Sequence, residues 1–151
     1  MSGFSCPVRI YWEDTDAGGI VYHANYFRFM ERARTEWLRS LGIEQEPLRT
    51  EQGIVFVVVN AEATFHRPAR YADLLQVSCR VQRATRASLM LQQDIVRSSD
   101  ALLLVSGSVR VACLDAEKFR PRLLPPSLFD LRAEPVPVRT LSTQGSAGGN
   151  R

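Results

Sequence analysis

The residues with the clearest capacity for chemistry lie in one short stretch, Asp14 to Tyr26, which reads DTDAGGIVYHANY. Asp16 comes just before Gly18 and Gly19, and glycines permit sharp turns and close approach of a ligand to the backbone. An apolar periodic segment follows and predicts a helix, whose first backbone N–H groups have no partner within the helix. A carboxylate beside such donors suits acyl transfer, because the donors stabilise an oxyanion while the carboxylate attacks or activates water.

Two other roles compete for the same loop. An aspartate before glycines commonly forms an Asx turn or caps a helix, and the residues alone leave this alternative open. A calcium loop is rejected, because Gly18 and Asn25 stand where such a loop needs an oxygen ligand and a bidentate glutamate. The chain has no glycine-rich nucleotide loop and no serine nucleophile elbow, and its two histidines, His23 and His66, cannot form a metal site by themselves. We therefore expect no metal.

Composition restricts the class of protein. The 151 residues are 45% hydrophobic and 23% charged, which fits one ordered domain with an ordinary core. The net charge of +3 comes from scattered arginines, so we expect no nucleic-acid partner. Three widely spaced cysteines form no disulfide framework and fit a reducing compartment. We find neither a signal peptide nor an apolar run long enough to cross a bilayer, so we expect a cytoplasmic protein.

Hydrophobic periodicity predicts the elements that position the loop. Val8, Ile10 and Trp12 alternate with polar residues and predict a half-buried strand before the loop. Apolar residues at three- and four-residue steps predict a helix from about Ala24 to Leu41, with Gly42 as its C-terminal cap. The solvent-exposed side of this helix is predicted to carry Arg32, Arg34 and Arg39.

Four further strands are predicted beyond Gly53, and short turns separate the later ones. They cover 54–66, 75–82, 88–96 and 101–114, the last with Leu103, Val105, Val109, Val111 and Cys113 on one face. Short turns indicate antiparallel pairing, because parallel strands need crossover helices. The simplest arrangement that buries both apolar faces is one long helix covered by a curved antiparallel sheet of about five strands, an α+β fold. We expect a single domain over residues 1–130 and a disordered tail, rich in proline, glycine and serine, over 131–151.

The loop and the helix after it, EDTDAGGIVYHANYFRFMERARTEWLRSLG, closely resemble the signature of the YbgC-like acyl-CoA thioesterases. These proteins belong to the 4-hydroxybenzoyl-CoA thioesterase group of hotdog-fold proteins. The resemblance continues through FVVVNAEATFHRPARYADLL and covers roughly residues 7–130. It implies a hotdog fold, which agrees with the element order above, and hydrolysis of acyl-CoA to free acid and CoA. No separate cofactor is implied, since coenzyme A is part of the substrate.

The resemblance also assigns roles to individual residues. Asp16 corresponds to the catalytic aspartate, as nucleophile or as general base toward water. The thioester carbonyl is expected beside Gly19, at backbone N–H groups from Tyr22 to Ala24. His23 matches a histidine that orients the thioester or water, or else is a structural residue of the helix start. Asp14 is expected to shape the loop.

Further expectations concern the substrate and the assembly. Glu31 matches an acidic position that faces the substrate chamber, although a charge network with nearby arginines is the alternative. The family implies a homodimer or homotetramer with active sites at subunit interfaces, to which the partner brings strand residues around 58–65. An acyl carrier protein thioester is a second substrate class. The arginines near strand turns are candidates for CoA phosphates, against the alternative of ordinary surface residues: Arg67, Arg70, Arg83 and Arg86.

Two other functions compete with thioester hydrolysis. One is a hotdog hydratase or dehydratase, whose histidine and carboxylate motifs we do not find. The other is a non-catalytic scaffold that binds acyl thioesters or acyl carrier protein, which has no need of Asp16. The preferred acyl group, of short or medium length or aromatic, stays undetermined by the sequence.

Overall fold

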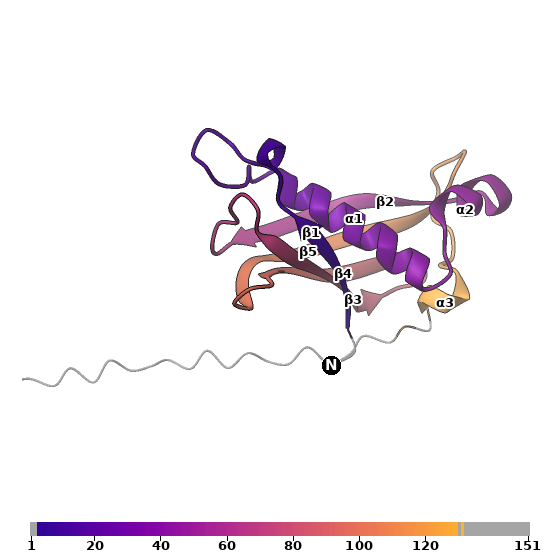
Figure 1. Ribbon diagram of the computed structural model, residues 1–151. Coiled ribbons are helices and arrows are strands. Elements are labelled where there is room, and N and C mark those ends of the chain that lie inside the picture. Colours follow the sequence, from indigo (N-terminus) through magenta and orange to yellow (C-terminus); the bar gives the residue numbers. More distant parts are fainter. Residues whose placement is uncertain (1–2, 130, 132–151) are drawn as a thin grey trace, which may run out of the picture.

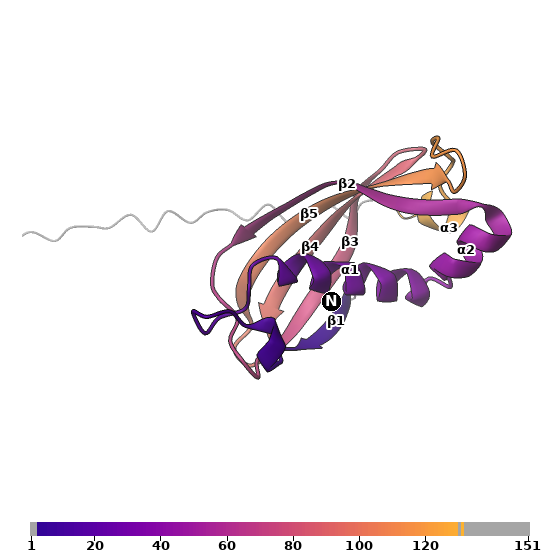
Figure 2. The same ribbon diagram turned by 90° about the horizontal axis from the view of Figure 1, so that it is seen from above.

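A computed structural model of the chain describes residues 3–129 and 131. In chain order the elements are β1 (Phe4–Arg9), the 3₁₀ turn η1 (Trp12–Asp14), α1 (Asn25–Ser40), α2 (Gln45–Gln52), β2 (Ile54–Phe65), β3 (Leu74–Ala84), β4 (Ser88–Arg97), β5 (Leu102–Asp115) and α3 (Pro126–Phe129). The five strands form one antiparallel sheet in the order β1-β3-β4-β5-β2. Figures 1 and 2 show α1 lying across one face of this curved sheet. The predicted α+β fold is confirmed.

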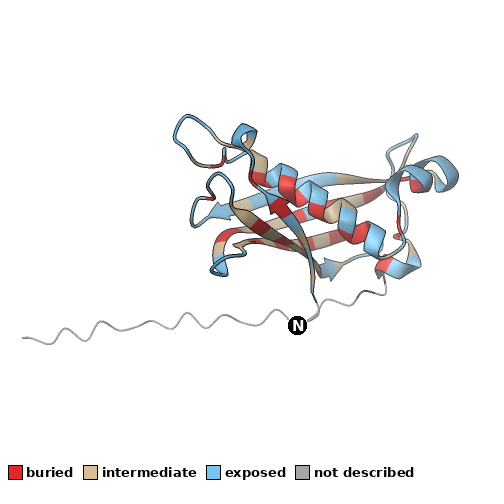
Figure 3. Cartoon of the chain, viewed as in Figure 1, coloured by how far each residue is buried: buried red, intermediate tan, exposed pale blue. Residues whose placement is uncertain are grey.

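Helix α1 packs on the sheet through an apolar stripe that recurs at three- and four-residue steps. Its buried residues are Tyr26, Phe29, Met30, Ala33, Trp37 and Leu38. The helix ends at Ser40, one residue before the predicted end at about Leu41, and Gly42 follows with a φ of +78°, as suits its predicted role in ending the helix. Strands β3 and β4 bury every second residue against it, which is the period expected of a sheet with one covered face. Figure 3 shows these buried positions along α1 and the central strands.

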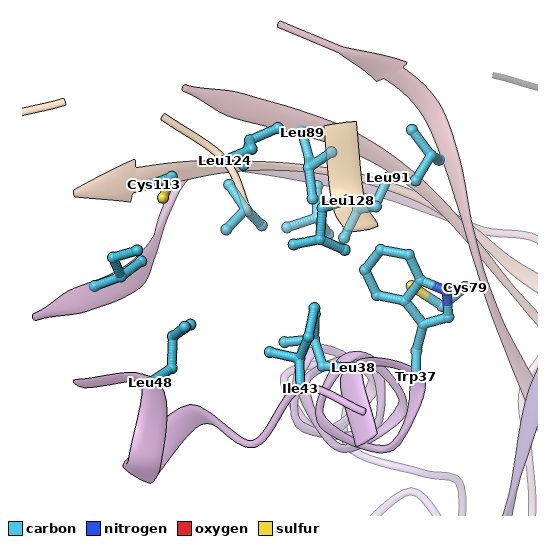
Figure 4. Packing of buried hydrophobic residues seen from close by; sticks show 14 residues of the cluster. Trp37, Leu38, Ile43, Leu48, Cys79, Leu89, Leu91, Cys113, Leu124 and Leu128 are labelled. Atoms are coloured by element: carbon cyan, nitrogen blue, oxygen red, sulfur yellow. The ribbon is translucent and has the colours of Figure 1, made fainter. Parts of the chain in front are cut away.

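The core consists of two clusters along the length of α1. One cluster surrounds the first half of the helix and includes Tyr26, Phe29, Leu75 and Val105. The other surrounds its second half, where Trp37 and Leu38 face β4 (Figure 4). Because the first cluster lies under the start of α1, it holds that start rigidly against the sheet.

The structure differs from the predicted elements at three places. Trp12 is 77% exposed and begins η1, because β1 leaves the sheet after Arg9. Helix α2 was not predicted, since its eight residues bury only Leu48 and show no apolar stripe. Leu103 is only partly buried, because a bulge in the pairing of β5 with β4 places Leu104 in the core instead.

The predicted C-terminal tail lies outside the described residues, apart from Leu131. Among the helices that the structure describes, none combines the length and apolar character needed to cross a membrane.

Candidate active site

Asp14 joins the loop to the start of α1. Its carboxylate Oδ2 accepts a hydrogen bond from the backbone N–H of Tyr11 at 2.8 Å. Its carbonyl oxygen accepts from the backbone N–H of Tyr22 at 3.0 Å and from Asn25 Nδ2 at 3.0 Å. The expectation that Asp14 shapes the loop is thus confirmed, and Asn25 fastens the first residue of the helix to that loop.

Asp16 stands at the tip of the loop with one carboxylate oxygen engaged. Its Oδ1 accepts a hydrogen bond from the Gly18 N–H at 2.8 Å, and its carbonyl accepts from the Gly19 N–H at 3.0 Å. Gly19 has a φ of +79°, a conformation that side chains disfavour. The Asx turn considered from the sequence is therefore present. Within the described residues no donor lies within hydrogen-bond distance of Oδ2, so the exposed carboxylate is oriented while this oxygen stays open to a reactant.

The start of α1 offers fewer backbone donors than the sequence predicts. Tyr22 donates its N–H to Asp14, which restricts the predicted donors to His23 and Ala24. Neither of these two N–H groups has a protein acceptor in the part of the chain that the structure describes. Ala24 occupies the cap position without a side-chain hydrogen bond. The helix dipole adds partial positive charge here, so the arrangement is suited to hold a carbonyl oxygen that gains negative charge.

His23 lies over a cavity of about 290 Å³ between the helix start and the end of β2. Its ring is 4.7 Å from the Tyr22 ring and 6.1 Å from the Phe65 ring, measured between centroids. The other lining residues are Ile20, Val21, Tyr26, His66, Arg67 and Pro68. His23 is exposed and lies at the mouth of a mainly apolar hollow beside the two backbone donors.

Tyr26 and His66 support the walls of this hollow. The buried Tyr26 hydroxyl accepts a hydrogen bond from the Ala69 N–H at 3.0 Å, and burial raises the pKa of that hydroxyl. His66 Nε2 lies 3.0 Å from Ser106 Oγ, which ties the end of β2 to β5. Sequence reasoning did not assign His66 to the site, and only the FHRP stretch of the family resemblance marks it.

The remaining predicted site residues do not all meet at this hollow within one chain. Glu31 lines a different cavity, on the side of α1 that faces β2. Arg67 lines the His23 cavity, and Arg70 bridges to Ile20 of the loop. Arg83 and Arg86 lie at the β3–β4 turn, at the opposite end of the sheet, where the Arg86 carbonyl accepts from Leu124. The four arginines therefore do not form one phosphate site in a single chain. Within the described residues, no cluster of three or more His, Cys, Asp or Glu is placed to hold a metal ion.

Comparison with known proteins identifies the family. The thioesterase superfamily model matches residues 18–104. The acyl-CoA thioesterase YbgC of Haemophilus influenzae is 44% identical over 124 residues, which cover 82% of this chain and 90% of that protein. The acyl-CoA thioester hydrolase YbgC of Escherichia coli O157:H7 is 43% identical over 125 residues, 83% of this chain and 92% of that protein.

Solved structures agree with this result. A probable thioesterase from Bartonella henselae superimposes with a TM-score of 0.76 at 35% identity, covering 82% of this chain and all of that chain. A 1,4-dihydroxy-2-naphthoyl-CoA thioesterase from Synechocystis shares the fold, with a TM-score of 0.78 at 22% identity, covering 84% of this chain and 93% of that chain. The chain therefore belongs to the thioesterase superfamily and is a YbgC-like thioester hydrolase with the hotdog fold.

Proposed function

We propose that this protein hydrolyses acyl-CoA thioesters to the free acid and CoA, with Asp16 as the reactive carboxylate. One observation carries the proposal: Asp16 is oriented through Oδ1, with Oδ2 open, in a loop that ends at two unoccupied backbone donors. The names of the YbgC relatives support the substrate class. The proposed chemistry requires no cofactor and no metal.

In the proposed mechanism the loop supplies the reactive carboxylate, and the helix start supplies the hydrogen-bond donors. The thioester carbonyl oxygen accepts hydrogen bonds from the N–H groups of His23 and Ala24, which stabilise the oxyanion of the tetrahedral intermediate. Asp16 Oδ2 then acts in one of two ways. It attacks the carbonyl carbon and forms a mixed anhydride, which water hydrolyses, or it takes a proton from the water that attacks. In both routes the C–S bond breaks and CoA leaves as the thiolate.

His23 is proposed to orient the thioester or water from the rim of the cavity. Its exposed ring and its contacts with Tyr22 and Phe65 place it beside the donors. Gly19 and the ring of Tyr22 are proposed to line the path of the thioester. Removing one donor to an oxyanion typically lowers kcat by about 10²–10³, and a general base contributes about 10²–10⁴.

The assembly is proposed to be a homodimer that pairs through β2, or a tetramer of two such dimers. β2 is an edge strand of the described sheet, and it exposes Val58 by 46%, Val59 by 53% and Phe65 by 47%. An unpaired apolar edge is an association hazard that pairing with a second copy removes. Such pairing would also bring β2 of the partner subunit toward the site, as the family resemblance implies.

The same chemistry applies to an acyl carrier protein thioester, which we propose as an alternative substrate. A cytoplasmic location is proposed because the cysteines of the described residues are unpaired, and Cys79 and Cys113 are buried. Free thiols persist in a reducing compartment.

Thiol release from a panel of acyl-CoAs tests the function. Short, medium and aromatic acyl-CoAs are offered to the wild-type protein, and free thiol is followed with a colorimetric reagent. Asp16→Ala is expected to lose at least about two orders of magnitude in kcat. Glu13→Ala is the matched control, because it removes an exposed carboxylate from the same region without removing a hydrogen bond between described residues.

Each alternative has its own outcome in this assay. Thiol release that survives Asp16→Ala refutes the role of Asp16. No release from any acyl-CoA favours the scaffold, and a change in enoyl-thioester absorbance without thiol release identifies a hydratase.

A further inference from the structure

A second cavity lies between the second half of α1 and the sheet. It has a volume of about 250 Å³, and its apolar walls include Trp37, Leu38, Phe56, Leu89 and Leu91. Figure 4 shows Trp37 and Leu38 rising from α1 toward the leucines of β4. Pockets for whole drug-sized ligands span about 300–1,000 Å³. This one is thus sized for a part of a ligand, and its apolar walls suit an acyl group rather than CoA.

Arg34 brings a positive charge to this cavity, whose other polar lining residues are Glu31, Thr35 and Gln45. The core fixes the position of the Arg34 side chain. Its Nη1 donates to Gln93 Oε1 at 3.0 Å, and Gln93 is completely buried. Gln93 Nε2 in turn donates to the Met30 carbonyl of α1 at 2.9 Å and toward the Ser78 carbonyl of β3 at 3.4 Å. The guanidinium is therefore attached to a buried amide that is itself held by both layers of the fold. Burial lowers the pKa of Arg34, as expected for a cation away from water.

Most of the hydrogen-bonding capacity of Arg34 is unused. A guanidinium has five N–H donors, and in the described part of the chain the bond to Gln93 is the only one that Arg34 makes. Glu31 lines the same cavity, but the two side chains form no ion pair. A half-buried cation with open donors stabilises a ligand oxygen placed against it.

We propose that Arg34 is a specificity-determining residue that recognises an oxygen acceptor, hydroxyl or carboxylate, at the distal end of the acyl group. This inference rests on the proposed function. Arg34 follows Asn25 by nine residues, or about 14 Å along the helix at about 1.5 Å per residue. Helical side chains lean toward the N-terminus, so the guanidinium lies closer than this to the helix start. An extended acyl chain of about eight to ten carbons, with its carbonyl at the helix start, is long enough to cover this distance.

Matched substrates test this recognition. Thiol release gives kcat/KM for octanoyl-CoA, 8-hydroxyoctanoyl-CoA and 7-carboxyheptanoyl-CoA, which differ only in the distal group. In the wild type, kcat/KM for at least one oxygen-bearing substrate is expected to exceed that for octanoyl-CoA by about tenfold, the ratio that one charge-assisted hydrogen bond supplies. If kcat/KM is higher for the hydroxyl substrate than for the carboxylate substrate, Glu31 acts as a second polar group, which accepts a hydrogen bond from the hydroxyl and repels an anion. If kcat/KM is higher for the carboxylate substrate, Arg34 binds the carboxylate through two hydrogen bonds.

Variants of the helix arginines separate recognition from structure. Arg34→Met is expected to bring the ratio of kcat/KM between the oxygen-bearing and the unsubstituted substrate close to one. Arg34→Lys is expected to retain part of this preference. Arg32→Met is the control, because Arg32 is exposed on the same helix and lies outside the cavity. A ratio near one in the wild type, or one that Arg34→Met leaves unchanged, refutes the proposal. A changed oligomeric state in Arg34→Met also refutes it, because Arg34 would then serve a contact between copies.

A binding readout keeps the inference separate from catalysis. Trp12 and Trp37 are the two tryptophans of the chain, so Trp12→Phe leaves Trp37, in the cavity wall, as the only indole. In this background, Asp16→Ala is titrated with octanoyl-CoA and 8-hydroxyoctanoyl-CoA. Tighter binding of the hydroxyl compound with a change in Trp37 emission supports the proposal. Binding by calorimetry without any change at Trp37 places the acyl group elsewhere and refutes it. If no thioester is hydrolysed by the wild type, the proposed function itself fails.

Discussion

Replacing Asp16 by asparagine separates the chemical role of its carboxylate from its structural role. The side-chain carbonyl of asparagine accepts the Gly18 N–H as the aspartate Oδ1 does at 2.8 Å, so Asp16→Asn retains the Asx turn. The substitution removes the negative charge and replaces the open oxygen with an amide nitrogen. Asp16→Ala removes both the charge and the turn. The two variants therefore differ in stability but share the loss of chemistry.

The expected magnitudes follow from the same geometry. The turn contains one hydrogen bond at an exposed position, which is worth about 0.5–1.5 kcal/mol. Asp16→Ala should lower the free energy of unfolding by that amount, and Asp16→Asn should change it by less than about 0.5 kcal/mol. Both should lower kcat by about 10²–10⁴, the usual contribution of a general base, which raises the activation free energy by about 3–5 kcal/mol.

Two measurements on the same preparations decide the question. Urea unfolding gives the free energy of unfolding, and thiol release from a good acyl-CoA substrate gives kcat. The expected pattern is an asparagine variant that is as stable as the wild type yet almost inactive. If Asp16→Asn keeps kcat within about threefold while Asp16→Ala loses it, Asp16 only holds the turn, and the assignment of the reactive carboxylate is wrong.

Three further predictions concern the scaffold around the site. Tyr26→Phe removes the phenol oxygen that accepts a hydrogen bond from the buried Ala69 N–H at 3.0 Å. Urea unfolding should therefore show a free energy of unfolding that is lower by about 1–3 kcal/mol; an unchanged value would mean that another acceptor takes over. Gly107→Ala places a Cβ 2.5 Å from Met30 Cε and 3.0 Å from the Gln93 backbone carbonyl oxygen. Met30 can shift its flexible end, but the backbone carbonyl cannot, so this overpacking should lower the melting temperature and the free energy of unfolding by about 1–3 kcal/mol; an unchanged melting temperature would mean that the fold accommodates the methyl group. Burial raises the pKa of Cys79 from 9.0 to about 12, so the folded state keeps a proton that the unfolded state loses above pH 9. Its contribution to stability is complete below pH 9 and declines between pH 9 and 12 by up to about 1.4 kcal/mol per pH unit. Urea unfolding between pH 8 and 10.5 should therefore show that the wild type loses stability faster with rising pH than Cys79→Ala; parallel curves would contradict the burial argument.

Hydrophobic periodicity predicts the helix and the five strands because each has one face that must be buried, and burial imposes its period on the sequence. The prediction fails at Trp12 for a non-local reason. Arg9 pairs with Leu74, the first residue of β3, so β1 has no partner strand beyond Arg9. The alternation continues in the sequence, but the chain turns into η1 and exposes the indole. The prediction misses α2 for a different reason. Its eight residues are mostly polar and include one buried leucine, so the sequence shows no hydrophobic period there.

The same distinction between local and non-local contacts applies to the site. The turn at Asp16 is predictable because its hydrogen bond spans two residues. The His23 cavity joins the helix start to the end of β2, a contact that no local pattern contains.

Arg34 shows the limit of sequence reasoning most clearly. The other two arginines that the sequence places on the solvent-exposed side of this helix, Arg32 and Arg39, are indeed exposed. The structure places Arg34 against Gln93, 59 residues away, on the wall of the cavity between α1 and the sheet. The Gln93 amide bonds both the helix backbone and the Arg34 guanidinium, and these contacts exist only when the helix is packed on the sheet. Residues whose partners are supplied by the tertiary fold therefore look ordinary in sequence, and specificity is expected to depend on such residues more than on the reactive loop itself.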